Sequence, residues 1–145
     1  MELPVRLLLP VDGSAFTKLA LDFLLGRLAW WREPPRVDLL HVEPPVGTAL
    51  ARSYLSRDVL DSYYAEQSEL VLGPALAALQ AAGLDVIAHR QVGDASRRIV
   101  EFSLKHQSDL IVMGSHGHTA LGSVALGSVA TKVLASCRVP VLIVR

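Results

Sequence analysis

The chain has one cysteine, Cys137, no excess of either charge and no long apolar run. A single cysteine cannot form an internal disulfide, which fits folding in a reducing compartment. No window approaches the roughly 18 uninterrupted apolar residues of a membrane span, and the first four residues lack the basic side chains of a secretory signal. We therefore expect a cytoplasmic protein that does not enter a membrane.

The absence of net charge also restricts the partners. The 14 acidic side chains balance the 14 basic ones, whereas a nucleic-acid backbone selects a strongly basic face. We therefore expect no nucleic-acid partner. The 145 residues are enough to bury roughly 68–70% of the unfolded surface. We expect a single domain, 1–145, that needs no disulfide or metal to hold its core.

Short apolar runs alternate with helical patterns along the whole chain. The predicted strands are 5–11, 36–42, 84–91, 109–114 and 139–144. Several are almost continuously apolar, as expected when helices cover both faces of a parallel sheet. The first helix follows Ser14, a candidate N-cap, and later helical patterns occupy 57–82, 95–106 and 126–136. The alternation predicts an α/β fold.

Two segments depart from this regular pattern. Gly73 and Pro74 lie inside the helical pattern 57–82, where proline removes a backbone donor, so a kink or break is predicted there. The segment 43–56 contains Pro44 and Pro45 and is longer than most connections between a strand and a helix. It is predicted to be a mobile loop near the strand ends.

A glycine-rich turn between the fourth strand and the last helix is the strongest functional signal. Glycines occur at 114, 117, 122 and 127. Residues without side chains let backbone N–H groups approach an anion, and a following helix N-terminus adds unpaired donors and partial positive charge. The turn therefore predicts a phosphate site. Its candidate residues are Met113, Gly114, Ser115, Gly117, Gly127, Ser128 and Val129, the two serines acting as hydroxyl donors.

Residues at the ends of the other predicted strands could bind the base and the ribose of a nucleotide. In an open parallel sheet, ligands bind outside the carboxyl ends of the strands. Pro10, Val11 and Val42 are predicted to form the apolar sides of an adenine slot. Asp12 can accept hydrogen bonds from ribose hydroxyls or hold Mg²⁺, and it can also cap the first helix. The strand ends therefore predict a nucleotide ligand, with magnesium held at Asp12.

Three histidines have simpler interpretations than catalysis. The run from Ser115 to His118 superficially resembles the His-x-Gly-His element of nucleotidyltransferases, but it follows the fourth strand instead of the first. His116 and His118 supply too few ligands for a closed zinc site. A protonated His116 could pair with a phosphate. His41, inside a strand, is expected to be a core histidine with satisfied hydrogen bonds.

Several separated segments together resemble the universal stress protein family. Gly114-x2-Gly117-x9-Gly127-Ser128 looks like the ATP-binding signature of that family, and 10–14 resembles its first-strand turn. The segments 39–42 and 139–144 are similar too. The resemblance implies a Rossmann-like, five-stranded parallel sheet of order 3-2-1-4-5 with helices on both faces, and a homodimer through the last strand, 139–144. It also implies that Val11, Asp12 and Val42 contact adenosine and that Gly114, Gly117, Gly127 and Ser128 hold the phosphates.

The glycine turn contains no lysine or arginine, and the Gly-x4-Gly-Lys-Ser/Thr phosphate loop is absent. We therefore expect bound ATP to be held, with slow hydrolysis at most. The leading interpretation is an ATP-binding stress-response regulator whose occupancy orders the loop after Val42. The alternatives are a weak ATPase or adenylyl-transfer enzyme, and a nucleotide-free dimeric scaffold.

The apolar last strand, 139–144, is predicted to lie at an edge of the sheet. There it could pair with the same strand of a second copy, unless Trp30 and Trp31 cover it.

Overall fold

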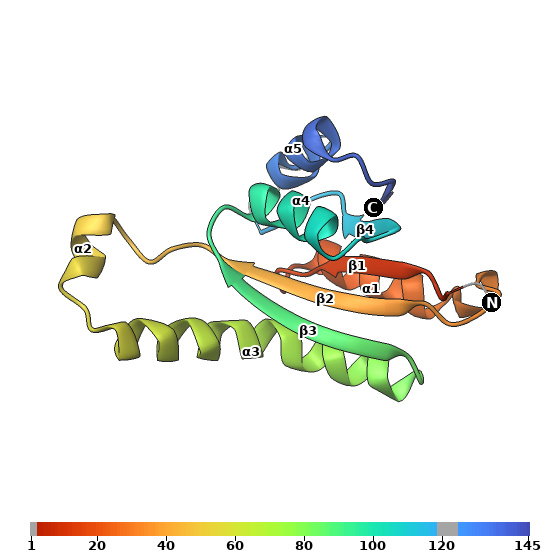
Figure 1. The fold of residues 1–145 in the computed structure, drawn as a ribbon, viewed down its shortest axis with the longest axis horizontal. Helices are drawn as coiled ribbons and strands as arrows, with labels where there is room; N and C mark the ends of the chain where they lie inside the picture. Colours follow the sequence, from red (N-terminus) through yellow and green to blue (C-terminus); the bar gives the residue numbers. More distant parts are fainter. Residues whose placement is uncertain (1–2, 119–124) are drawn as a thin grey trace.

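A computed structural model describes residues 3–118 and 125–145 of the chain (Figure 1). Its strands are β1 (Arg6–Pro10), β2 (Arg36–Glu43), β3 (Asp85–Val92), β4 (Leu110–Gly114) and β5 (Val141–Val144). All neighbouring strands are parallel, and they form one sheet in the order β3-β2-β1-β4-β5. The α/β fold and the strand order implied by the family resemblance are confirmed.

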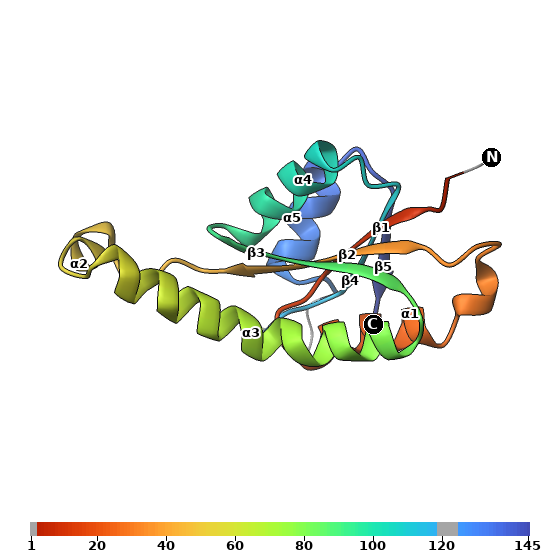
Figure 2. The same ribbon diagram turned by 60° about the horizontal axis from the view of Figure 1, so that its bottom comes forward.

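Helices cover both faces of the sheet. They are α1 (Ala15–Leu25), α2 (Ala49–Ser53), α3 (Arg57–Ala81), α4 (Ala95–Lys105) and α5 (Ser128–Ser136), with a short 3-10 turn, η1 (Leu28–Trp30). Figures 1 and 2 show α1 and α3 on one face and α4 and α5 on the other. Right-handed crossovers require this division, because the chain reverses its direction across the sheet after β3. None of the helices in the described ranges is both long and apolar enough to cross a bilayer.

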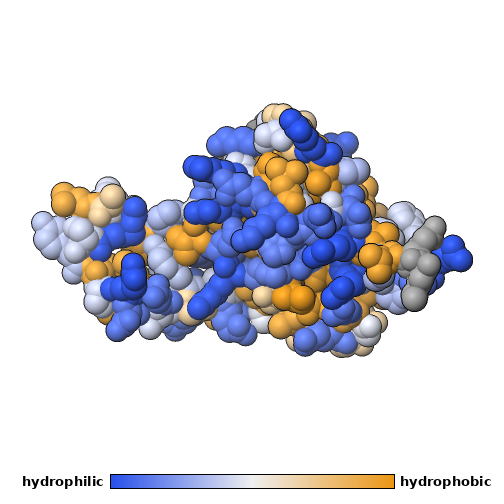
Figure 3. Space-filling model, viewed as in Figure 1, coloured by the Kyte–Doolittle hydropathy of each residue, from blue (hydrophilic) through white to orange (hydrophobic). Residues whose placement is uncertain are grey.

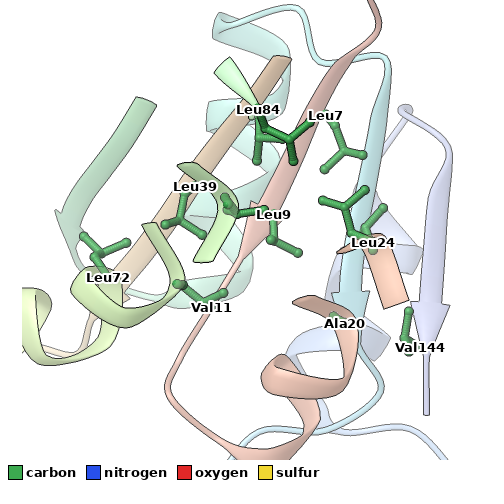
Figure 4. Packing of buried hydrophobic residues seen from close by; sticks show 13 residues of the cluster. Leu7, Leu9, Val11, Ala20, Leu24, Leu39, Leu72, Leu84 and Val144 are labelled. Atoms are coloured by element: carbon green, nitrogen blue, oxygen red, sulfur yellow. The ribbon is translucent and has the colours of Figure 1, made fainter. Parts of the chain in front are cut away.

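The strand side chains divide the core into two layers. Leu7 and Leu9 of β1 pack with Leu39 beneath α1 and α3 (Figure 4), whereas Leu8 packs with Leu40 beneath α4 and α5. Successive side chains of a strand point to opposite faces, so a strand covered on both faces needs apolar residues at every position. This requirement explains the continuous apolar runs in the sequence.

The predicted break at Gly73 and Pro74 is wrong, because α3 runs without interruption from Arg57 to Ala81. Proline ordinarily crowds the Cβ of the preceding residue, and Gly73 has none. Leu70, whose carbonyl loses its helical N–H partner to the proline, is 69% exposed, so water can reach that residue. Leu72 and Leu79 on either side are buried in the core, and their packing supports the helix across the proline.

Part of the segment 43–56, predicted to be a loop, is the helix α2. Together with the first half of α3 it forms an arm that projects from the rest of the molecule (Figures 1 and 3). The Val46 N–H donates to the Tyr64 hydroxyl at 3.0 Å, and Arg52 donates to the carbonyls of Val46 and Gly47, each at 2.9 Å. The Tyr64 bond ties the segment to α3, and the two Arg52 bonds hold α2 against the turn before it. Six large apolar residues are exposed on the arm: Leu50, Tyr54, Leu55, Val59, Tyr63 and Leu70.

Candidate functional site

A cleft of about 990 Å³ lies at the carboxyl ends of the strands, within the size range of ligand pockets. Parallel strands bring the turns that follow them to one edge of the sheet, so residues distant in sequence meet there. Ten of the eleven predicted site residues line the cleft: Pro10, Val11, Asp12, Val42, Met113, Gly114, Gly117, Gly127, Ser128 and Val129.

Ser115 is the exception, because it is fully buried behind the cleft lining. Its hydroxyl lies 2.8 Å from Nδ1 of His116, and its N–H donates to the Val144 carbonyl at 2.8 Å. Its carbonyl accepts the Gly127 N–H at 2.7 Å. Ser115 therefore ties the start of α5 to the end of β4, and its hydroxyl is not placed to donate into the cleft.

The glycines of the turn differ in what their missing side chains permit. A Cβ at Gly117 would lie 2.6 Å from Oδ2 of Asp12, and one at Gly127 would lie 3.0 Å from the Cα of His116. A Cβ at Gly114 would lie 2.7 Å from the Phe16 carbonyl oxygen. Gly117 thus lets the turn approach Asp12, Gly127 lets the start of α5 lie against His116, and Gly114 lets α1 pack on β4. Gly122, also predicted to shape the turn, lies outside the described residues.

The start of α5 supplies backbone donors to the cleft. Gly127 is the N-cap and has no side chain to cap the helix. The following N–H groups of Ser128, Val129 and Ala130 belong to the first turn, where no intrahelical acceptor exists, and these three residues line the cleft. A helix N-terminus with free N–H groups attracts anions. This wall of the cleft is therefore suited to a phosphate chain.

The Asp12 carboxylate faces the same turn. Its Oδ1 accepts the Ser14 N–H at 2.8 Å, and the Ser14 hydroxyl in turn accepts the Thr17 N–H at 3.3 Å. Ser14 is thus the predicted N-cap of α1, and Asp12 orients the turn before it. His118 Nε2 donates to the Asp12 carbonyl at 2.5 Å.

A magnesium ion fits this arrangement only together with a ligand. In the described residues, no group of three or more histidine, cysteine, aspartate or glutamate side chains could form a metal site by itself. Mg²⁺ commonly takes one or two protein carboxylates plus phosphate oxygens and water. Asp12 offers one such carboxylate, with Oδ2 turned toward Gly117.

Residues that were not among the eleven predicted site residues also line the cleft. Among them are Glu43, Gln67 and Asp94. The Asp94 carboxylate accepts hydrogen bonds from the Ser96 hydroxyl at 2.7 Å and from the Arg97 N–H at 3.0 Å. These two bonds, the Ser96 bond more than the Arg97 bond, lower the pKa of Asp94 below its ordinary value. Glu43 directly follows 39–42, one of the segments that resemble the family. This position is the only sequence signal that could have identified Glu43 as a site residue.

His41 is the core histidine that the sequence predicted. Its side chain is nearly inaccessible, with Nδ1 2.8 Å from the Val11 carbonyl oxygen and Nε2 2.7 Å from Oε2 of Glu43. Both His116 and His118 line the cleft, and the His116 ring lies against Phe16 with centroids 4.8 Å apart.

Comparisons with known proteins agree with this architecture. Residues 5–145 match the model of the universal stress protein family. Universal stress protein MJ0531 of Methanocaldococcus jannaschii is 28% identical over 141 residues, which cover 97% of this chain and 81% of the relative. The solved structure of hypothetical protein MJ0577 has a TM-score of 0.83 at 28% identity and covers 97% of this chain and 94% of its own.

Structures with lower identity share the fold. A universal stress protein family protein from Arabidopsis thaliana, solved with AMP bound, has a TM-score of 0.70 at 18% identity and covers 97% of this chain and 91% of its own. Structures of the same fold have been solved with cAMP and with dAMP. Because the family model matches almost the entire length, the chain belongs to the universal stress protein family.

Proposed function

We propose that residues 1–145 form one nucleotide-binding domain that holds ATP and acts as a stress-response regulator. The observation that carries the proposal is the grouping of the α5 N-terminus, the Asp12 carboxylate and the apolar residues Val11 and Val42 around one cleft. These parts complement a phosphate chain, a ribose and a base. Structures of the same fold with AMP, cAMP or dAMP bound support an adenine nucleotide as the ligand class.

The lining residues divide along the length of such a ligand. Pro10, Val11, Val42 and Met113 would enclose the base, and Asp12 would accept from the ribose. Gly114, Gly117, Gly127, Ser128 and Val129 would surround the phosphates. A magnesium ion bound with ATP would neutralise phosphate charge, and Asp12 would hold it together with phosphate oxygens.

The site is equipped to hold ATP more than to cleave it. Among the described residues that line the cleft there is no lysine or arginine. Phosphoryl transfer usually relies on such cations, along with metal, to stabilise charge at the transferred phosphate. We therefore infer slow hydrolysis at most. A turnover near the enzyme median of about 10 per second would contradict this inference and favour an ATPase.

ATP would act through the arm and through the dimer. Pro44 and Pro45 line the cleft and lead directly into the arm, which carries exposed apolar residues. A bound nucleotide would order this connection and so change the surface offered to a partner. We further propose a homodimer paired through β5 and a location in the cytoplasm.

Calorimetric titration with ATP, with and without Mg²⁺, tests the site. Ser128→Asp places a carboxylate at the first position of α5, where it stabilises the helix through the macrodipole but repels a phosphate. We expect the wild type to bind one ATP per chain. The control Ser128→Ala loses one hydroxyl donor but keeps the backbone N–H groups of α5, so it should also bind one ATP per chain. Ser128→Asp should bind at least about tenfold more weakly, with an unchanged or higher melting temperature. No ATP binding by the wild type would favour the nucleotide-free scaffold.

A further inference from the structure

The contact between His41 and Glu43 requires a proton between them. The Val11 carbonyl oxygen can only accept a hydrogen bond, so Nδ1 of His41 carries a proton and donates it at 2.8 Å. At 2.7 Å from Oε2 of Glu43, Nε2 either donates a second proton to a carboxylate or accepts from a protonated carboxyl. In both states, Oε2 is committed to the imidazole and the Glu43 side chain is held in place.

The other carboxyl oxygen of Glu43 remains for a ligand. Glu43 lines the cleft, and within the described part of the chain no group is bonded to its Oε1. With Glu43 ionised, this oxygen is a hydrogen-bond acceptor only. One directed acceptor at a nearly buried, hydrogen-bonded position is suited to recognising a donor.

The order of the strands places this acceptor at the base end of a nucleotide. The cleft crosses the ends of β2, β1 and β4, which are neighbours in the sheet (Figure 1) and lie about 4.8 Å apart. With phosphates at α5 beyond β4 and the ribose at Asp12 after β1, the base extends toward β2. Glu43 is the last residue of β2, so it stands where the edge of the base arrives.

Two other polar residues of the cleft lining are less suited to discriminate between bases. Asp94 uses Oδ2 to accept from Ser96 and Arg97 as the cap of α4. Gln67 carries an amide, which can both donate and accept. Asp94 is also a fixed acceptor, but it is exposed to solvent. The Glu43 side chain is only 16% exposed, so a hydrogen bond to it competes less with water.

We propose that Glu43 is a specificity-determining residue that accepts a hydrogen bond from the exocyclic amine of a nucleobase, with His41 as its positioning residue. The inference rests on the proposed nucleotide function and names the feature of the ligand that this cleft selects. A carboxylate pairs with guanine at two points, N1–H and the 2-amine, and this requires both oxygens. Since His41 holds Oε2, this two-point pairing with guanine is lost, whereas Oε1 alone is sufficient for the single 6-amine of adenine.

The test compares ATP with purine riboside 5′-triphosphate, which lacks only the amine, and with GTP. A charge-assisted hydrogen bond corresponds to about a 10- to 100-fold difference in affinity. We expect the wild type to prefer ATP to purine riboside triphosphate by about that factor and to bind GTP more weakly than ATP. Glu43→Ala should reduce the ATP preference to about 1. Glu43→Gln should give an intermediate preference, because its amide oxygen can still accept.

The matched control is Glu66→Gln, which neutralises an exposed carboxylate of α3 outside the cleft lining and should retain the wild-type preference. Equal binding of ATP and purine riboside triphosphate by the wild type overturns the inference, as does GTP binding as tight as ATP. A wild-type preference retained in Glu43→Ala also overturns it. If a thermal melt shows that Glu43→Ala does not fold, the test relies on Glu43→Gln and on the ratio of the wild-type affinities for ATP and purine riboside triphosphate. Failure of the wild type to bind any of the three nucleotides overturns the proposed function itself, a result distinct from equal binding.

Discussion

The environment of His106, at the C-terminal end of α4, makes the stability of the fold depend on the protonation of its ring. Its ring stacks on Phe102 with centroids 3.9 Å apart. Burial of the ring, and then the charge of nearby His89, lower the pKa of His106 below the ordinary 6.5. The folded chain therefore binds this proton less readily than the unfolded chain. The contribution to stability is complete above pH 6.5 and is lost as the pH falls through the folded-state pKa.

Replacing His106 with phenylalanine keeps an aromatic ring on Phe102 and removes the titration. We expect the free energy of unfolding of His106→Phe to fall less than that of the wild type between about pH 7 and about pH 5. Urea unfolding at a series of pH values measures both curves. Parallel curves across this range would show that His106 does not link protonation to folding.

At the scale of secondary-structure elements, the caps decide where helices begin and end. Asp94 caps α4, and the bonds from Ser96 and Arg97 that fix it there also lower its pKa below 3.8. At the end of α3, Gly83 adopts a φ of +81°, and the Leu84 N–H returns to the Leu79 carbonyl at 3.2 Å. This is a Schellman motif, in which glycine is favoured because its positive φ costs no steric strain.

Removing the α4 cap has a predictable cost. Asp94→Ala should lower the free energy of unfolding by about 1 kcal/mol at neutral pH, whereas Asp94→Asn, which retains a capping oxygen, should lose less. A carboxyl with a depressed pKa contributes its stability above pH 3.8 and loses it as the pH falls through the folded-state pKa. The difference between wild type and Asp94→Ala should therefore shrink below about pH 4. Chemical denaturation at neutral and acidic pH measures it, and equal stability at neutral pH would contradict the capping role.

At the scale of the whole molecule, β5 is an edge strand that pairs in the described residues only with β4. The carbonyls of Pro140 and Val144 accept from the β4 side, at 2.9 and 2.8 Å. Alternate residues of a strand turn their hydrogen-bonding groups to opposite sides. Val141 and Ile143 therefore direct their N–H and C=O groups to the open side, where a second copy could pair. Trp31 packs against the core cluster that contains Val144, whereas Trp30 is 70% exposed.

Ile143→Pro tests the proposed dimer. Proline at this position removes an outward N–H, keeps the bonds to β4 and is tolerated on edge strands. We expect the wild type to sediment at twice the 15.7 kDa chain mass and Ile143→Pro to sediment at the mass of one chain. Ile143→Ala loses most of the same side chain but keeps the N–H, so it should remain dimeric. A wild type that sediments as a single chain at micromolar concentrations would contradict the dimer.

Local patterns in the sequence predicted the elements well where one physical effect dominates. The strand predicted at 109–114 is β4, Leu110–Gly114, because a short apolar run that contains β-branched residues and is followed by glycine is typical of a buried strand. The last helix, predicted from 126, begins at Ser128 with Gly127 as its cap. Pro74 was misread because its penalty depends on its neighbours, and Gly73 together with core packing removes most of it.

The site was less predictable wherever a residue's role depends on a distant partner. Ser115 and Ser128 flank the same turn, yet only Ser128 faces the cleft, because the Ser115 backbone bonds to β5 and to the start of α5. Glu43 enters the site because parallel pairing places the end of β2 beside the ends of β1 and β4. Tyr64 orders the segment after β2 from 18 positions away. None of these partners can be inferred from local spacing.

The sequence by itself determined the α/β class, the approximate positions of the strands and the glycine turn, because each follows from local periodicity or from the conformational freedom of glycine. The tertiary structure alone decided which polar atoms are bonded inside the protein and which are left facing the cleft. That choice is made by parallel pairing, which brings the ends of β1, β2 and β4 to one edge of the sheet. Burial there commits Ser115, His41 and one oxygen of Glu43 to internal bonds, and it leaves the α5 N-terminus, Asp12 and the second oxygen of Glu43 for a ligand.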